Sequence, residues 1–302
     1  MKRKIDWWIY TVPILLVITF TCYFIVLSRP GLTGVILFYL APLLISFLAI
    51  IFLLIGIILS LIRRPVFNPW RIAGFTGLIL LCFSGIIYNT YPSSYDDKPS
   101  KVQFRLPLDT AISVAWGGAE ECVNYHVIAP DQRWAYDLMI IKDDRTFTGD
   151  SSKLENYFCY GLDVVAPAAG KVVTVFDSDP DMEPGVLGGG TLPVGNHIVI
   201  EVAPKEYLFI CHLQPKSIKV KTGDQVQQGQ LLGLVGNSGN TSEPHVHIHL
   251  QDTKIQSLGE GIPLYFHHYS VNGKYVERGI PTGGIGDDGK FIGQTVKNVS
   301  MD

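Results

Sequence analysis

The stretch SEPHVHIHL, residues 242–250, places three histidines at alternate positions, His245, His247 and His249. Successive side chains of a β-strand point to opposite faces, so the three imidazoles lie on one face while the residues between them face a core. Two residues span about 6.8 Å of strand, which lets His245 and His247 converge on one small site. His249 lies about 13 Å from His245 along the strand and is expected outside that site, at a solvent-facing strand end.

Short β-type runs surround this stretch, separated by Gly, Pro, Asn and Asp, and helical periodicity is nearly absent. The candidate strands are Lys171–Phe176, His197–Val202, Tyr207–Leu213, Gln230–Gly236 and His245–Gln251. Strands spaced this closely favour antiparallel pairing. We therefore expect a mainly antiparallel β domain of sandwich or barrel type over residues 116–270, followed by a C-terminal tail over 271–302.

The first third of the chain is strongly apolar and predicts an α-helical membrane region of three spans over residues 1–91. Trp7–Leu27 is free of charge and long enough to cross a hydrocarbon core of about 30 Å. The run Leu32–Ile62 is longer than one crossing requires, so the second span is expected at Leu37–Ile62, and the third at Ile72–Tyr91. The polar, turn-rich segment that follows predicts a linker and domain entry over 92–115.

Basic residues in the short loops predict the orientation of these spans. Lys2, Arg3 and Lys4 precede the first span, Arg63, Arg64 and Arg71 lie between the second and third, and Arg29 lies in the other loop. The positive-inside rule then places the N-terminus in the cytoplasm and the C-terminal domain outside, in a multi-pass protein of the cell membrane.

The charge and cysteine content of the outer part narrow its partners. Seven of the 24 basic residues and one of the 27 acidic residues precede Pro92, so the remainder carries a formal charge of −9. Such a surface argues against nucleic acid as a partner. Cys122, Cys159 and Cys211 would lie where disulfides persist, and Cys122 with Cys159 is the expected pair.

Two further positions carry side chains that an apolar strand does not favour. Asp137 is an isolated acid in WAYDLMI, residues 134–140, and its burial is costly unless something positive meets it. His212 ends the apolar run YLFICHL, residues 207–213, and is either a hydrogen-bonded structural histidine or a polar group beside His245 and His247. Three protein ligands with one open position are what a zinc hydrolase requires, and histidine with carboxylate is a usual set.

Three segments together resemble the lysostaphin-type zinc endopeptidases, the twenty-third metallopeptidase family. They are GNSGNTSEPHVHI at 236–248, ICHL at 210–213, and VKTGDQVQQGQLLGLVG at 220–236, and the resemblance covers about Trp116–Gln251. It implies a lysostaphin-type β fold that cleaves peptide cross-links of the bacterial cell wall.

The first metal motif of that family is where this chain departs, and two assignments are open. In CYGLDVVAPAAGKVV, residues 159–173, Cys159 occupies the histidine position and Asp163 the aspartate position. Alternatively, the ligands are His126 and Asp137, in a variant pattern that also matches Asn124, Gln132 and Ala135. We favour the second assignment because Asp163 stands too close to the AGKVV turn.

The resemblance implies a role for each residue of the site. Zn²⁺ would be held by His126, Asp137 and His247, and it would activate a water for attack on an amide carbonyl. His212 and His245 would be catalytic and would not bind metal, orienting or deprotonating the water and serving the oxyanion or the leaving amine.

The remaining candidates are expected to be structural. His197 is expected on the surface of a strand, His267 and His268 in a loop, and Cys211 as a small buried apolar group.

The sequence thus predicts a membrane-anchored zinc endopeptidase that hydrolyses peptidoglycan peptides, with the lipid bilayer as its other partner. Two alternatives remain: an inactive family member acting as a wall-binding or regulatory module, and a phosphocarrier-like domain, which requires a cytoplasmic face.

Overall fold

The computed structural model describes residues 6–63, 65–66 and 68–299. The chain divides into two compact units, Met1–Ser93 and Ser94–Asp302. Lys2, Arg3, Lys4 and Arg64, on which part of the orientation argument depends, lie outside the described residues.

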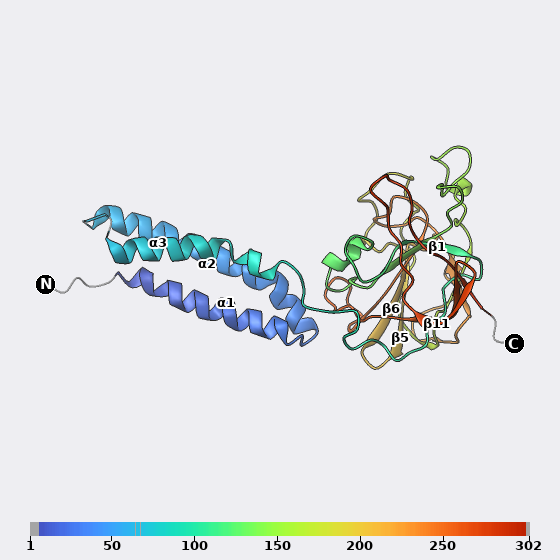
Figure 1. Cartoon of the computed structure of the whole chain (residues 1–302), viewed down its shortest axis with the longest axis horizontal. Helices are drawn as coiled ribbons and strands as arrows, with labels where there is room; N and C mark the ends of the chain where they lie inside the picture. The colour runs from blue at the N-terminus through green and yellow to red at the C-terminus, as the bar shows by residue number, and fades with distance from the viewer. Residues whose placement is uncertain (1–5, 64, 67, 300–302) are drawn as a thin grey trace. The chain divides into compact units, whose positions relative to one another are not determined.

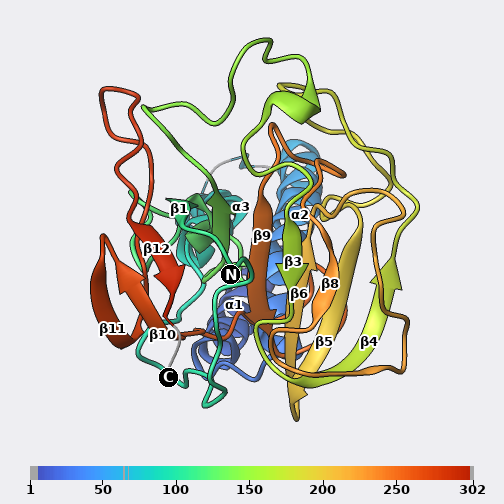
Figure 2. The same cartoon turned by 90° about the vertical axis from the view of Figure 1, so that its right-hand side faces the viewer.

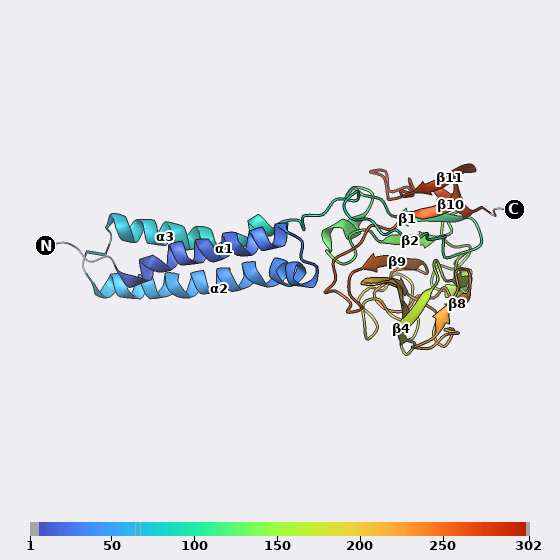
Figure 3. The same cartoon turned by 90° about the horizontal axis from the view of Figure 1, so that it is seen from below.

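The first unit is helical, and its helices lie side by side (Figures 1 and 3). They are α1 (Thr11–Leu27), α2 (Leu32–Ile62) and α3 (Pro69–Cys82), and 3-10 turns at Trp7–Tyr10 and Ser84–Tyr88 extend the first and the third. Within the described residues, three segments are long and apolar enough to cross a membrane: Trp7–Leu27, Leu32–Ile62 and Pro69–Tyr88. This confirms the predicted helical region.

Two boundaries differ from the sequence-based prediction. The second helix begins at Leu32 rather than Leu37. Pro42 lies inside it without ending it, as membrane helices tolerate. The third begins at Pro69, three residues before the predicted Ile72. The Asn68 side chain accepts a hydrogen bond from the Arg71 backbone N–H, which caps this helix, and proline suits its first position.

The second unit contains a large antiparallel sheet, and Figure 2 shows its strands. Within residues 94–299 ten strands pair in the order β11-β10-β12-β1-β2-β9-β6-β5-β4-β7, and β3 pairs with β8. Their bounds are β1 Ile112–Trp116, β2 Tyr136–Met139, β3 Asp163–Val165, β4 Gly170–Phe176, β5 His197–Ala203, β6 Glu206–Cys211, β7 Gln225–Val226, β8 Leu231–Leu234, β9 Val246–Gln251, β10 Phe266–Val271, β11 Lys274–Gly279 and β12 Thr295–Asn298. The predicted mainly antiparallel β domain is confirmed.

The chain beyond residue 270 also takes part in this sheet. β11 and β12 lie within 271–302, the segment expected as a tail, and β12 pairs with both β1 and β10. His267 and His268, expected in a loop, lie in β10 instead. The sequence pattern missed this strand because a pair of adjacent histidines interrupts the alternation of apolar and polar residues.

The centre of the sheet positions the candidate site. β9 lies between β2 and β6, with His247 opposite Asp137 on one side and opposite Cys211 on the other. Residues opposite one another in adjacent strands project to the same face. The other face of β9, with Val246 and Ile248, belongs to the main hydrophobic core.

Candidate active site

Asp137 is the centre of a group of buried polar side chains. Its carboxylate is 3% exposed and is contributed by β2, a strand whose neighbouring residues are apolar. Oδ1 lies 2.9 Å from His247 Nδ1 and 3.4 Å from His245 Nε2, and Oδ2 lies 3.5 Å from His126 Nε2. Three imidazole rings therefore surround this acid.

His126 is held by a local turn. Asn124 precedes the 3-10 turn Tyr125–Ile128 and accepts a hydrogen bond from the His126 backbone N–H. The Asn124 amide nitrogen donates to the carbonyl oxygens of Gly118 and Ala135, which leaves Oδ1 as the acceptor for His126 Nδ1 at 2.9 Å. The ring therefore carries its proton on Nδ1, and its bare Nε2 faces Asp137.

His212 reaches the site by a departure from strand geometry. β6 ends at Cys211, and His212 adopts φ of +60°, in the left-handed region. Strand alternation therefore does not place this ring. Its Nδ1 donates to the Ser238 carbonyl oxygen at 2.8 Å, and its ring centre lies 4.7 Å from that of His245. Nε2 is consequently the bare nitrogen.

His245 directly precedes β9 and His247 is its second residue, and both rings reach Asp137, as the alternation predicts. His245 Nδ1 donates to the Glu243 carbonyl oxygen at 2.8 Å, so its Nε2, which faces Asp137, is bare. His126, His212, His245 and His247 together with Asp137 form what we call the histidine cluster.

The protonation states of the residues in the histidine cluster bear on whether the cluster can bind a cation. Burial lowers the pKa of His126 to about 4 and lowers that of His212 well below its ordinary value. Burial alone would raise the pKa of Asp137, but His126 and His245 hold it well below its usual range. His245 differs: burial lowers its pKa, but Asp137 together with Glu243 raises it by more. The carboxylate of Asp137 and the neutral rings of His126 and His212 are in the protonation state that binds a divalent metal.

Two overlapping sets of the described residues could hold an ion, His126 with Asp137 and His247, and His212 with His245 and His247. Within each set the ligand atoms lie within 4.8 Å of one another, and every residue is buried. The first set combines two imidazoles with a carboxylate, a donor set that zinc accepts in hydrolases. The chemistry of the residues thus fits zinc.

Cys159 and Asp163, the other candidates for the first metal motif, lie outside the histidine cluster. Cys159 is buried, its thiol donates to the Pro244 carbonyl oxygen at 2.8 Å, and burial raises its pKa to about 12. Asp163 is exposed at the start of β3. Neither belongs to a set of described residues that could hold a metal ion.

Several expectations about the other histidines and cysteines were wrong. His249 is fully buried rather than solvent-facing, because β9 continues to Gln251 under the covering loops. His197 is 4% exposed rather than on the surface, with its ring stacked on those of Phe176 and Phe209. Cys122 and Cys159 are both free, the first exposed and the second buried, whereas Cys211 is buried as expected.

Tyr125 is a site residue that the sequence patterns did not identify. Its hydroxyl donates to Asp137 Oδ2 at 3.1 Å, and its ring lies 4.0 Å from that of His126, centre to centre. The available signal was its position directly before His126. A half-exposed aromatic residue in a turn does not by itself distinguish a site residue from a surface residue.

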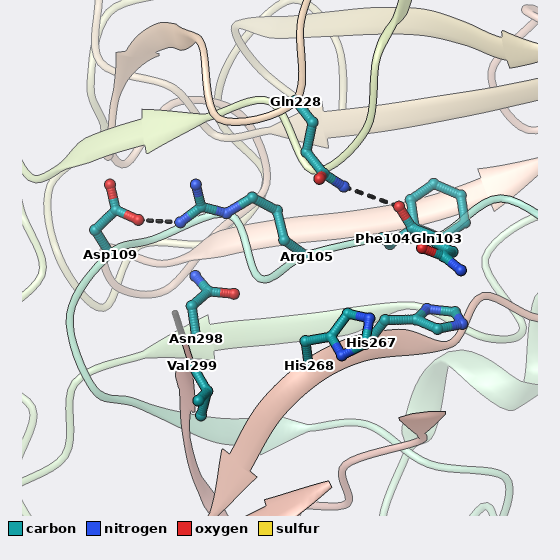
Figure 4. Close-up of a pocket in the computed structure, with 9 residues that line it drawn as sticks. All are labelled: Gln103, Phe104, Arg105, Asp109, Gln228, His267, His268, Asn298 and Val299. Carbon is teal, nitrogen blue, oxygen red and sulfur yellow. Dashed lines mark hydrogen bonds and ion pairs between the residues drawn. The ribbon is translucent and has the colours of Figure 1, made fainter. Parts of the chain in front are cut away.

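A separate cavity of about 450 Å³ lies in the same unit, and Figure 4 shows its lining. Its polar residues are largely paired: Arg105 with Asp109, while Gln228 Nε2 donates to the Gln103 and Pro167 carbonyl oxygens. His267 and His268 line it with one carboxylate, that of Asp109. It therefore lacks the convergence of bare nitrogens and carboxylate found in the histidine cluster.

A phage endolysin is similar to part of this chain in sequence, and solved peptidase structures are similar to parts of it in fold. Endolysin 2638A of Staphylococcus phage 2638A is 30% identical over 123 residues, which make up 37% of this chain and 25% of the endolysin. The catalytic domain of lysostaphin from Staphylococcus simulans superposes with a TM-score of 0.25 at 21% identity, covering 39% of this chain and 85% of that domain. The deep-sea M23 metalloprotease pseudoalterin gives a TM-score of 0.33 at 16% identity, covering 59% and 96%.

A family model gives the assignment. Residues 157–258 match the model of peptidase family M23, a range that contains His212, His245 and His247. His126 and Asp137 precede this range, in the part where the sequence departs from the usual first motif. Residues 157–258 of the β domain are therefore similar to peptidase family M23, the lysostaphin-type peptidases.

Proposed function

We propose that this protein is a membrane-anchored, zinc-dependent endopeptidase that hydrolyses peptide bonds of bacterial peptidoglycan. The observation that carries the proposal is the convergence of one buried carboxylate and four imidazoles within an M23 domain. Metallopeptidase chemistry is general in this family. The choice of substrate is supported by the similarity to lysostaphin-type enzymes and to a phage endolysin.

Zinc is assigned to His126 Nε2, Asp137 and His247 Nδ1. A buried carboxylate that faces bare ring nitrogens brings lone pairs against negative charge, and a divalent cation between them removes that repulsion. A set made of His212, His245 and His247 would leave the Asp137 carboxylate without the charge it requires. Zinc at this position supplies a Lewis acid that activates water and polarises the scissile carbonyl.

His212 and His245 are assigned to proton transfer. Each donates its Nδ1 proton to a backbone carbonyl oxygen, which fixes the ring and leaves Nε2 able to take up and release a proton. Hydrolysis adds water to the carbonyl carbon, breaks the C–N bond and delivers one proton to the departing amine. Two imidazoles with bare Nε2 atoms provide both the acceptor and the donor for this exchange.

The helical unit is assigned to membrane anchoring, with the peptidase domain outside the cell. Large apolar side chains such as Val17, Leu43, Phe47 and Leu80 are more than 60% exposed in the first unit, a surface that lipid covers better than water. Arg63 directly follows α2 and Arg71 lies in the first turn of α3, and these basic residues favour a cytoplasmic position for this end of the two helices. Anchoring then restricts cleavage to wall close to the membrane.

The full-length protein in detergent tests this function. We expect bound zinc, and new amine termini when the protein is incubated with purified peptidoglycan. Asp137→Ala serves as the matched inactive control because it removes the carboxylate assigned to zinc. Protein that binds no zinc and releases no amine, even after zinc is added, would contradict the proposal and favour a non-catalytic wall-binding module.

A further inference from the structure

We propose that His249 and Gln251 are positioning residues that hold the proton of His247 on Nε2 and so keep its Nδ1 free for the metal. This inference rests on the proposed zinc site. It concerns the part of β9 that lies behind the histidine cluster, where His247, His249 and Gln251 alternate on one face of the strand. His249 and Gln251 are fully buried, and His247 is nearly so.

The hydrogen bonds of Gln251 decide which atoms donate and which accept among His247, His249 and Gln251. Gln251 Nε2 donates to the carbonyl oxygens of Thr253 and Ile255, at 2.6 and 2.9 Å. The amide is thereby oriented, and its Oε1 can only accept. Gln251 Oε1 and His249 Nε2 are both buried without a partner of good geometry among the described residues. The two side chains are two residues apart on one face of β9, so Gln251 Oε1 and His249 Nε2 can each supply the partner that the other lacks.

These constraints fix the tautomers of both rings. With Gln251 Oε1 as acceptor, His249 carries its proton on Nε2, and its Nδ1 becomes an acceptor. His249 Nδ1 lies 3.0 Å from His247 Nε2, so His247 must be the donor in that hydrogen bond. The proton of His247 is then on Nε2, and the lone pair of its Nδ1 points to Asp137.

The orientation of the His249 ring is itself fixed by packing. Its plane stacks on Phe209 of β6 with ring centres 4.6 Å apart and 13° between the planes. Phe209 lies directly opposite His249 in the sheet. The stack fixes the plane of the ring. Within that plane, the contact with His247 Nε2 defines the edge that carries Nδ1.

This order of donors and acceptors matters because the proton of His247 could instead lie on Nδ1. Its Nδ1 lies 2.9 Å from Asp137 Oδ1, close enough to form a hydrogen bond if the proton moved to Nδ1. That hydrogen bond would join His247 Nδ1 to Asp137 Oδ1, and the two groups assigned to zinc would then bind each other instead of the metal. By accepting from Nε2, His249 opposes this metal-free state, as outer partners of ligand histidines do in metal sites generally.

Two matched substitutions test the inference in the full-length protein in detergent. His249→Phe keeps the stack on Phe209 and removes the acceptor. His197→Phe makes the same change in a buried ring that also stacks on Phe209, but outside the cluster. With a chromophoric chelator as competitor at pH 8, we expect zinc to bind His249→Phe about 10–100-fold more weakly than the wild type. His197→Phe should keep the wild-type affinity, and His249→Gln, which retains an acceptor oxygen, should recover most of it.

A second measurement reads the tautomer directly and does not depend on any variant folding. In the wild-type protein labelled with ¹⁵N-histidine, we expect the His247 proton on Nε2 both with and without zinc. A proton on Nδ1 without zinc, or wild-type zinc affinity in folded His249→Phe, would overturn the inference. A wild-type protein that binds no zinc at all would instead overturn the proposed function.

Discussion

Asp137 controls the site at the scale of single residues, because it contacts three of the four imidazoles. We expect His126→Ala and Asp137→Ala each to lose zinc, and Cys159→Ser to keep it. The reason is that Cys159 is turned toward a backbone carbonyl and is not near the other ligand candidates. Zinc content of the purified variants, measured by atomic absorption, decides between the two assignments. Loss of zinc in Cys159→Ser with retention in His126→Ala would reverse our assignment.

His212 and His245 belong to the reaction rather than to metal binding in this account. Their replacement by alanine should leave one zinc per chain and reduce amine release from peptidoglycan by at least about 100-fold, the usual contribution of general acid–base groups. Zinc content and turnover must be measured on the same preparation. Loss of zinc in these variants would instead point to the set formed by His212, His245 and His247.

The sequence patterns pointed to the five residues that the structure brings together in the histidine cluster, and their roles stay predictions. The patterns did not point to His249. Its burial depends on how far β9 continues and on what covers it, and neither is encoded in the alternation of the strand. His212 shows a related limit, since its positive φ removes it from the pattern on which strand alternation is based.

At the scale of elements, the turn before β5 supports the loop that orients His212. Gly195 has φ of +56°, and a Cβ there would lie 2.2 Å from the Ser238 carbonyl oxygen, the acceptor for His212 Nδ1. Gly195→Ala should therefore displace that oxygen and lower turnover at least about tenfold through misorientation, with zinc retained.

Gly185 offers a matched control in the same connection. It has φ of +83° and open space around its Cβ position. Gly185→Ala costs about 1 kcal/mol of backbone strain without this displacement. We expect its zinc content and turnover to match the wild type. Equal turnover in Gly195→Ala and Gly185→Ala would show that the Ser238 carbonyl does not set the His212 orientation.

Part of the β domain was predictable, since β4, β5, β6, β8 and β9 fall on the candidate strands of the sequence, whereas β1, β3 and β7 do not. The strands after residue 265 were not, because their residues are mixed in polarity. Phe266, Tyr269 and Val296 enter the main core, and β12 joins β10 to β1. The helices follow directly from uninterrupted apolar length.

At the scale of the whole molecule, the proposed orientation can be tested on a native side chain. Outside the helical segments, Cys122 is exposed while Cys159 and Cys211 are buried. A membrane-impermeant maleimide should therefore label the wild-type protein in intact protoplasts, and Cys122→Ser should remove the label. Labelling that appears only after the protoplasts are lysed would place the domain in the cytoplasm and revive the phosphocarrier-like alternative.

The position of the metal tests the central claim most directly. Crystals of the protein grown with zinc, measured on both sides of the zinc absorption edge, should give one anomalous peak in the domain. The account predicts that this peak lies about 2.0–2.2 Å from His126 Nε2, an Asp137 oxygen and His247 Nδ1. A peak bound by His212 and His245, or no peak near Asp137, would contradict it.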